Sequence, residues 1–363
     1  MTKSVTHSEL VPILELDALQ QAQWRGMQAA NPALASPYFS LDFARLIAAR
    51  RTDTHALVLK RNGRTAGFLP LHLSMTGIAR PLGGPLGDHH GLITDDPGLD
   101  LHSALGSSPV PLFTYSGALA SQAAGCDGTS HTEPSWVIDL HSGHEAWLEN
   151  RRQADAKAMR NIRARQRKLE ACGDEVVFRL DDRRPEILAR TFATKREQYR
   201  RTGAFDVFGA RWARHLMRDL FDHHSDELRG CMSTLEIGGE LAAAHFGMRS
   251  QSVLHYWFPV YWSAHAHLGP GLQLLLEMAK QLPETGIESI HLGPGDFDFK
   301  HKLANASFQI AEGRIGRRSL AAGLVSLGAG IDRWSSRLPV GRASAWPGKA
   351  LSRLDALAAT YCL

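Results

Sequence analysis

Cysteine, long apolar runs and strong net charge are all scarce in this chain. The four cysteines are far apart and form no C-x-x-C pair, which argues against a disulfide scaffold or a zinc site, and we expect no metal. No run approaches the roughly 20 apolar residues that cross a bilayer, and the N-terminus lacks the apolar core of a signal peptide. We therefore expect a cytoplasmic protein, at most peripheral at the inner membrane.

The charge balance also excludes function classes. A net charge of +4, from 41 basic and 37 acidic residues, is too mild for a general nucleic-acid binder but allows a local basic patch. With 363 residues the chain has room for two domains, and 44% apolar content is typical of a globular protein.

The first 140 residues predict two interrupted helices followed by a hairpin. Residues 18–50 show helical spacing broken by NPALASP, and strands at 55–60 and 66–73 flank the turn signal Asn62-Gly63. Residues 80–98 are rich in Gly, Pro and Asp and predict a loop. Their DHHG segment is interpreted as plain loop, because adjacent histidines on a strand point in opposite directions and make a poor metal site.

A strongly basic helix is expected next. The strand SWVIDL (135–140) precedes a helix with Ser142 as N-cap, and this helix continues to residue 170. Eight lysines and arginines fall within 151–169, against a single acidic residue. Arg160, Arg163 and Arg167 share one helical face and are candidates to bind an anionic substrate group; a merely solvated face is the alternative.

Residues 175–260 predict a second α/β series. We expect a strand at 175–180, helices at 185–200 and 211–222, a hairpin of 229–236 with 240–248, and a strand at 252–260. Tyr199, on the inward face of the first of these helices, is assigned to the substrate site.

The pentapeptide HLGPG occurs twice, at 267–271 and 291–295. The first copy opens an amphipathic helix that ends near Pro283, so its bare backbone N–H groups and positive dipole end predict an anion site. The predicted site comprises His267, Leu268, Gly269, Pro270, Gly271 and Leu272. Because a strand at 287–292 follows, the segment between the two copies is a crossover unit.

The second copy leaves its strand beside the first and carries His291, Asp296 and Lys300 to the same cleft. In this hypothesis Lys300 binds a substrate phosphate and Asp296 orients the acceptor. The alternatives are plain Gly-Pro turns and a surface ion pair between Asp296 and Lys300, which are spaced i, i+4.

These motifs together resemble a known family. The order of elements resembles the C-terminal half of GNAT-type acyltransferases related to the CelD/BcsL cellulose-biosynthesis proteins. It comprises a hairpin, a strand, G-P-G opening a helix, another strand and L-G-x-G-x-x-x-x-K. The CelD/BcsL proteins are in turn similar to the FemAB peptidyltransferases. W…SPYFSLDF (24–43), NGRTAGFLPL (62–71) and the basic helix extend the resemblance over about residues 15–315. Three positions depart from the family pattern: Ala266, His291 and Phe299 replace an Arg or Gln, an Asp and a Tyr.

The resemblance implies an α/β fold of two tandem GNAT-like domains: a degenerate one at 1–140, an acyl-CoA-binding one at 141–315 that includes the basic helix 145–170, and a basic amphipathic tail at 316–363. It implies acetyl transfer from acetyl-CoA to a nitrogen or oxygen of a sugar, lipid-linked or nucleotide-linked, in exopolysaccharide or envelope polysaccharide synthesis. Within that reaction, His255 or His291 is the base and Tyr256 or Tyr261 the donor to the departing sulfur. Each histidine has a purely structural alternative.

Other functions remain open from the sequence. A catalytically degenerate GNAT-fold protein would bind a nucleotide ligand and regulate polysaccharide production, and a nucleic-acid binder would use the basic helix. The tail, with its cations and apolar stripe, would lie on a membrane, bind a cyclic dinucleotide or, as we favour, pack on the body of the protein.

Overall fold

The computed structural model describes residues 5–106, 108–123, 129–316, 357 and 359–360. We call residues 5–123 the N-terminal part and residues 129–316 the C-terminal part. The N-terminal part contains strands β1 (His7–Pro12), β2 (Thr54–Arg61), β3 (Arg64–Leu73), β4 (Ile78–Pro81) and β5 (Leu112–Leu119), helices α1 (Ala18–Ala30), α2 (Leu41–Ala48), α3 (Leu101–Gly106) and α4 (Ala120–Ala123), and 3-10 helices η1 (Ile13–Glu15), η2 (Pro32–Leu34), η3 (Pro37–Phe39) and η4 (Gly84–Leu86).

The C-terminal part contains strands β6 (Thr129–Asp139), β7 (Val176–Arg179), β8 (Arg229–Ile237), β9 (Glu240–Arg249), β10 (Val253–Tyr261), β11 (Ser289–Gly293) and β12 (Ala306–Gly316), helices α5 (His144–Ala154), α6 (Ala156–Glu170), α7 (Pro185–Thr202), α8 (Arg211–Asp222), α9 (Pro270–Gln281) and α10 (Asp298–Leu303), and 3-10 helices η5 (Val207–Gly209), η6 (Ser263–Leu268) and η7 (Leu282–Thr285). Among the described residues, no helix combines the length and apolar character that crossing a membrane requires.

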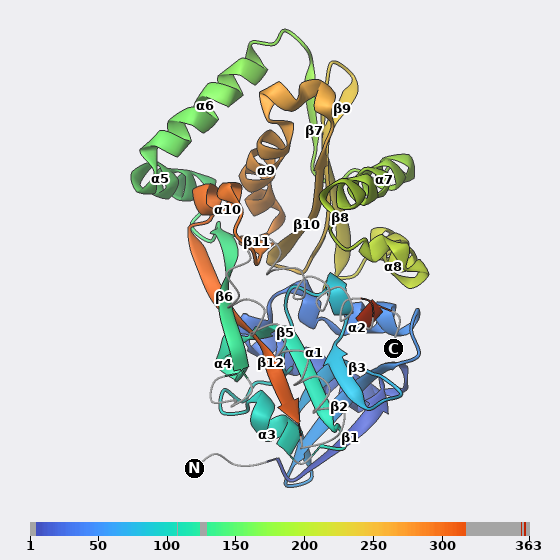
Figure 1. The fold of residues 1–363 in the computed structure, drawn as a ribbon. Coiled ribbons are helices and arrows are strands. Elements are labelled where there is room, and N and C mark those ends of the chain that lie inside the picture. The colour runs from blue at the N-terminus through green and yellow to red at the C-terminus, as the bar shows by residue number, and fades with distance from the viewer. Residues whose placement is uncertain (1–4, 107, 124–128, 317–356, 358, 361–363) are drawn as a thin grey trace, which may run out of the picture.

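One mixed sheet joins the two parts. The strands of the described chain follow the order β1-β2-β3-β4-β5-β12-β6-β11-β10-β9-β8-β7. Only β4–β5 and β10–β11 are parallel pairs. The last strand of the described chain, β12, pairs with β5 on one side and with β6 on the other. It therefore joins the strands of the N-terminal part to those of the C-terminal part (Figure 1). The mixed α/β fold class is confirmed.

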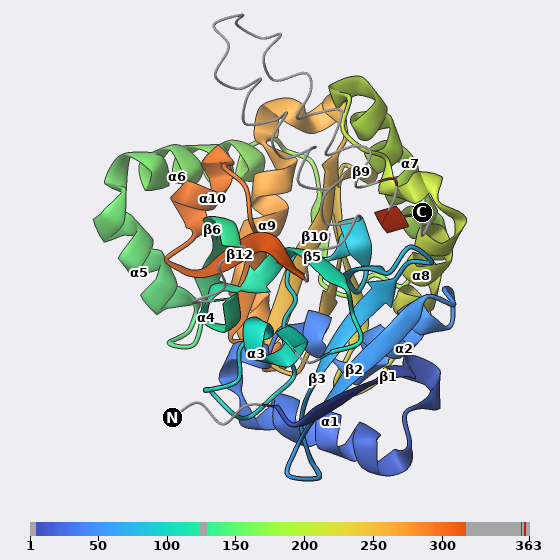
Figure 2. The ribbon, with the colours of Figure 1, turned by 60° about the horizontal axis from the view of Figure 1, so that its bottom comes forward.

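Hydrophobic packing also crosses between the parts. One core combines Trp24 and Phe43 of the N-terminal part with Leu216, Phe246 and Phe258 of the C-terminal part. A second core lies under α9, α5 and α6, on the side of the sheet away from α7 and α8 (Figure 2). The face of β10 opposite to α9 is thus covered by residues from both parts of the chain.

The predicted turns and most predicted elements are present. Asn62 and Gly63 both have positive φ, 52° and 76°, as a two-residue hairpin turn between β2 and β3 requires. The helices and strands expected between residues 175 and 292 all occur, and β10, α9 and β11 form the expected parallel crossover.

The basic helix differs from the prediction in two ways. Its N-cap is Gly143, with no capping side chain, and not Ser142. The helix is also not continuous: α5 ends at Ala154, and α6 begins anew after Asp155, whose carboxylate accepts a hydrogen bond of 2.8 Å from the Ala158 N–H. The single acidic residue of this segment thus breaks the helix, because its side chain satisfies the free N–H of the second one.

Most of the tail lies outside the described residues, and so do its cations from Arg317 to Arg353. The described end contacts the body of the protein. Arg51 Nη1 donates to the carbonyl oxygens of Ala359 and Thr360 at 2.9 and 2.8 Å, and Trp212 Nε1 donates to Thr360 O at 2.8 Å.

Candidate active site

A buried histidine and a carboxylate from the other part of the chain form the centre of the site. His255, on β10, is 0% exposed, and its Nε2 lies 3.0 Å from Oδ2 of Asp88 in the loop after η4. A proton on Nε2 donated to Asp88 leaves Nδ1 with a lone pair, and this buried nitrogen has no partner among the described residues. The geometry therefore provides an oriented imidazole with a free basic nitrogen.

Two more histidines contact this pair. The parallel register of β10 and β11 places His291 opposite His255, on the same face of the sheet. His89 packs edge-on against both rings, with centroids 5.5 Å apart in each case, and its Nε2 lies 2.7 Å from Ser135 Oγ. No group of three or more His, Cys, Asp or Glu in the described ranges has the arrangement of a metal site.

Burial keeps the accessory groups neutral. It lowers the pKa of His291 to about 3 and, together with the charge of His255, places the pKa of His89 well below its usual value. Burial and the Asp88 carboxylate raise the pKa of Tyr38, whose ring lies 4.8 Å from that of His255 and whose hydroxyl donates to Leu86 O. His89, His291 and Tyr38 thus surround the Asp88–His255 pair without adding charge.

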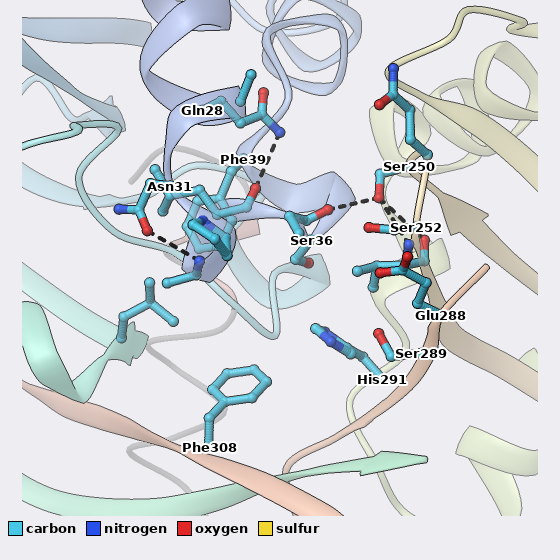
Figure 3. A pocket seen from close by; sticks show the side chains of 18 of the residues that line it. Gln28, Asn31, Ser36, Phe39, Ser250, Ser252, Glu288, Ser289, His291 and Phe308 are labelled. Carbon is cyan, nitrogen blue, oxygen red and sulfur yellow. Dashed lines mark hydrogen bonds between the residues drawn. The ribbon is translucent and has the colours of Figure 1, made fainter. Parts of the chain in front are cut away.

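A large cavity reaches this cluster. It has a volume of 1090 Å³ and is lined by both parts of the chain, with His291 and Phe308 on one side and the segment from Gln28 to Phe39 on the other (Figure 3). Most of its polar lining consists of neutral hydroxyl and amide side chains: Gln28, Asn31, Ser36, Ser121, Ser250, Gln251, Ser252, Ser289 and Gln309. Such a lining suits a ligand rich in hydroxyl groups.

The charged residues that line the cavity are one arginine and three carboxylates, Asp139, Glu227 and Glu288. Its only lining arginine in the described chain, Arg25, pairs with Glu227 at 2.7 Å and with Asp42 at 3.2 Å. Burial raises the pKa of Glu227. The cavity itself therefore offers no unpaired arginine for a phosphate.

The first HLGPG turn lies past the other end of β10. Gly269 has φ 64° and ψ 50°, and α9 begins at the next residue. A methyl group at Gly269 would lie 3.4 Å from Nη1 of Arg165 on α6, whereas one at Gly271 would meet only Tyr261, at 3.7 Å. Tyr261 is 59% exposed. The positive end of a twelve-residue helix and the Arg165 guanidinium thus converge on one surface, which fits an anionic group.

Along β10 the features follow in order. The cavity touches Ser252 and Val253, Asp88 pairs with His255, and the segment that ends in the first HLGPG turn begins after Tyr261. The strand therefore separates the turn from the histidine cluster by about 20 Å, at roughly 3.3 Å for each residue. An extended ligand lying along the strand would connect the two.

The second HLGPG turn is held by internal hydrogen bonds. Lys300 is buried, and its Nζ donates to the carbonyl oxygens of Gly293, at 3.1 Å, and of Pro294. The interpretation of Lys300 as a free phosphate ligand does not match this placement, because both contacts are structural. Asp296 is exposed and pairs with His301, so the alternative ion pair with Lys300 is also wrong.

The other predicted residues are scattered. Arg160, Arg163 and Arg167 are exposed on α6, away from its buried Met159 and Ile162. Tyr256 points to the opposite face of β10 from His255, where it stacks on His245 at 4.4 Å within the α9 core. Tyr199 is half-buried, and burial together with Asp206 and Asp88 raises its pKa.

Sequence reasoning missed four residues. Asp88 and His89 lie in the loop interpreted as plain, and no local signal connects them to a strand 167 residues later. Arg165 was passed over within the basic helix. Lys195, on α7, has its Nζ 3.3 Å from Pro259 O of β10, and burial lowers its pKa to about 8. The helical spacing of α7 predicts that Lys195 lies near Tyr199, four residues later, but it does not predict that Lys195 is buried.

Comparisons with known proteins bear on this arrangement. Residues 156–301 match the family model described as an acetyltransferase (GNAT) domain. That stretch runs from α6 through β10, the first turn and α9 to the second turn. No curated protein matches the chain.

Several solved structures are similar in fold. The structure of FemX is 10% identical, with a TM-score of 0.55, covering 88% of this chain and 99% of that one. The C-terminal domain of a protein described as a lysylphosphatidylglycerol synthetase from Agrobacterium fabrum is 12% identical, with a TM-score of 0.51, covering 85% and 96%. A tandem GNAT protein of the clavulanic acid pathway is 14% identical, with a TM-score of 0.48, covering 86% and 100%. The domain match, on this fold, supports an acyl-CoA-dependent acyltransferase of the GNAT type.

Proposed function

We propose that the protein transfers an acetyl group from acetyl-CoA to an amine or hydroxyl of a sugar used in bacterial exopolysaccharide or envelope polysaccharide synthesis. The observation that carries the proposal is the pairing of buried His255 with half-buried Asp88, beside His291 of the hydroxyl-lined cavity and on the strand that leads toward a helix N-terminus suited to phosphate. The relation to the CelD/BcsL proteins stays a prediction, as do the two-domain division and the acceptor.

The first turn fits the phosphate end of coenzyme A. The bare backbone at Gly269 and Gly271, the N-terminus of α9 and Arg165 would hold that end. When bound, acetyl-CoA would supply a thioester carbonyl at the end of an extended chain, for which β10 offers a path from the turn toward His255. Arg165 replaces Arg160, Arg163 and Arg167 in our assignment of the anion-binding cations.

His255 is proposed as the general base. Asp88 fixes its tautomer, so Nδ1 accepts the proton that the acceptor amine or hydroxyl loses as its nitrogen or oxygen bonds to the acetyl carbon. The carbon–sulfur bond breaks in the same transfer, and the departing thiolate takes a proton. Lys195 of α7 is the candidate donor. Its Nζ lies 3.3 Å from Pro259 O in the C-terminal half of β10, and its pKa of about 8 suits a general acid near neutral pH.

Neutral neighbours have an indirect role in this scheme. His291 lines the cavity beside His255, and His89 and Tyr38 hold the ring of His255 in place. We class these three as positioning residues, and Tyr256 is removed from the proposal because its hydroxyl lies on the far face of the strand.

Free-thiol release from acetyl-CoA with a panel of amino sugars tests the function. We expect His255→Ala to lower kcat/KM by at least about 100-fold, the scale of general-base catalysis. His102→Asn, exposed on α3, is the matched control. Tight nucleotide binding without thiol release from any acceptor would instead favour the regulatory alternative.

A further inference from the structure

Two arginines face each other at the far end of the β8–β9 hairpin. Arg229 and Arg249 are directly opposed partners in the antiparallel register of these strands. Like charges in this position repel, so the arrangement is costly unless an anion lies between them. Both side chains are half-buried, which strengthens the repulsion.

Neither arginine has a carboxylate partner among the described residues. Arg249 donates to Thr285 O and Oγ1 at 3.0 and 3.1 Å, and Arg229 Nη1 lies 3.3 Å from His224 Nε2. By contrast, the nearby Arg183 forms an ion pair with Asp181. Burial and the charge of Arg229 lower the pKa of Arg249, and the charges of Arg183 and Arg229 contribute to lowering that of His224. The Asp181 carboxylate offsets part of this positive charge at Arg249, but no carboxylate of the described residues forms an ion pair with either arginine.

The pair lines a small pocket that adjoins the large cavity. Its volume is 350 Å³, and its lining residues are His224, Ser225, Asp226, Arg229, Arg249, Ser250 and Gln251. Ser250 and Gln251 also line the 1090 Å³ cavity, so one ligand can occupy both. Asp226 is the only carboxylate in this described lining, and it forms no ion pair with either arginine in the described chain.

We propose that this pocket binds a phosphate ester of the acceptor, whose sugar occupies the large cavity beside His291. The inference rests on the proposed function, and it narrows the acceptor to a sugar that carries a phosphate or diphosphate. Arginine forks match phosphate oxygens in pairs, while the neutral lining of the cavity suits the sugar hydroxyls. A nucleotide-linked sugar and a lipid-linked sugar share this chemistry.

Titration calorimetry on the full chain with saturating coenzyme A, which fills the first turn, tests the site. The probes are N-acetylglucosamine, its 1-phosphate, UDP-N-acetylglucosamine, geranyl diphosphate and glucuronate. We expect the 1-phosphate to bind at least about tenfold more tightly than the free sugar, and the nucleotide and lipid probes to show which phosphate source is preferred. Arg229→Gln should remove that tenfold advantage, and Arg218→Gln, exposed on α8, should leave it unchanged.

Arg229→Gln is the decisive variant, because the only side-chain hydrogen bond of Arg229 among the described residues is to His224. Arg249→Gln would also lose the hydrogen bonds to Thr285. Arg249→Lys keeps the charge and should retain part of the affinity for the phosphate. Equal binding of free and phosphorylated sugar, binding of glucuronate alone, or an unchanged advantage in Arg229→Gln overturns the proposal.

The thiol-release assay separates this inference from the function. If Arg229→Gln abolishes phosphate binding but no acceptor gives thiol release, the phosphate site is supported and acetyl transfer is rejected. Thiol release with neutral sugars, at a KM that Arg229→Gln does not change, retains acetyl transfer and rejects the phosphate site.

Discussion

The two HLGPG turns share five letters but have different surroundings. At the first, Gly269 adopts the left-handed conformation and α9 follows directly, with exposed His267 on one side and Arg165 on the other. At the second, the left-handed glycines are Gly293 and Gly295, and no long helix follows.

The neighbours explain the difference. Gly293 lies so close to Asp88 that a methyl group there would be 2.6 Å from Oδ2, and Lys300 fixes the carbonyl oxygens of the turn from within. The first turn exposes its backbone, while the second uses its own to seat the Asp88–His255 pair. In the proposed function, the repeated motif therefore serves ligand binding in one place and the positioning of catalytic groups in the other.

Gly293→Ala should have the largest effect. Its φ of 73° strains any side chain, and the new methyl would displace Asp88 from His255. We expect kcat/KM for thiol release to fall at least about 100-fold, and the free energy of unfolding to fall by about 2 kcal/mol. Urea denaturation and the thiol assay measure both, and turnover within twofold of wild type would contradict the role of the second turn.

Lys300→Met should mainly destabilise the second turn. The change leaves the carbonyl oxygens of Gly293 and Pro294 without their donor, at a cost of about 1–3 kcal/mol in the free energy of unfolding. Lys302→Met is the control, since that partly exposed lysine pairs with the exposed Asp298 and should change stability by less than about 0.5 kcal/mol. Equal effects of the two variants in urea denaturation would reject the structural role of Lys300.

Gly269→Ala should affect ligand binding at the first turn more than stability. The left-handed φ of 64° costs an alanine about 1 kcal/mol, and its methyl would touch Arg165. We expect the KM for acetyl-CoA to rise, with little change in the sugar KM. Gly271→Ala, whose methyl would meet only Tyr261 at 3.7 Å, should raise the acetyl-CoA KM less than Gly269→Ala does. A higher acetyl-CoA KM in Gly271→Ala alone would reverse this assignment.

The leading histidines of the two turns should differ in their effect on acid stability. The pKa of His291 is about 3 in the folded protein and about 6.5 in the unfolded chain, so the unfolded state takes up the proton first as pH falls below 6.5. The stability that the neutral ring contributes is therefore lost between pH 6.5 and 3.

Urea denaturation at pH 7.5 and 5.5 measures this loss. Going from the higher to the lower pH, we expect His291→Gln to lose about 1 kcal/mol less than wild type. His267→Gln, at an exposed position of the first turn, should lose as much as wild type. A wild-type response in both variants would contradict the neutral burial of His291.

Local patterns in the sequence predicted the elements of the C-terminal part well. The apolar spacing of α9, the alternation of β10 and the glycines of the turns encode short-range geometry, and the structure has all of them. They also singled out His255 and His291 as candidate bases, and the parallel register of β10 and β11 then places both on one face of the sheet. The break at Asp155 was not predicted, because the apolar spacing continues through this residue and only its capping side chain indicates a new helix.

Local patterns could not predict the partners of those histidines. Asp88 and His89 reach the site from a loop whose composition indicates only a turn, and Tyr38 comes from a 3-10 helix still further away. The burial that lowers the pKa of Lys195 and of Lys300 likewise depends on packing between distant segments.

The sequence by itself determined the mixed α/β character, the crossover with its glycine turn, and the candidate histidines, since each depends on spacing within one or two elements. Only the tertiary structure decided that Asp88 holds His255, that Lys300 supports a turn, and that Arg229 opposes Arg249 beside the large cavity. These pairings join residues across one sheet built from both ends of the chain, and long-range strand order is fixed by the packing of the whole core and not by any local pattern.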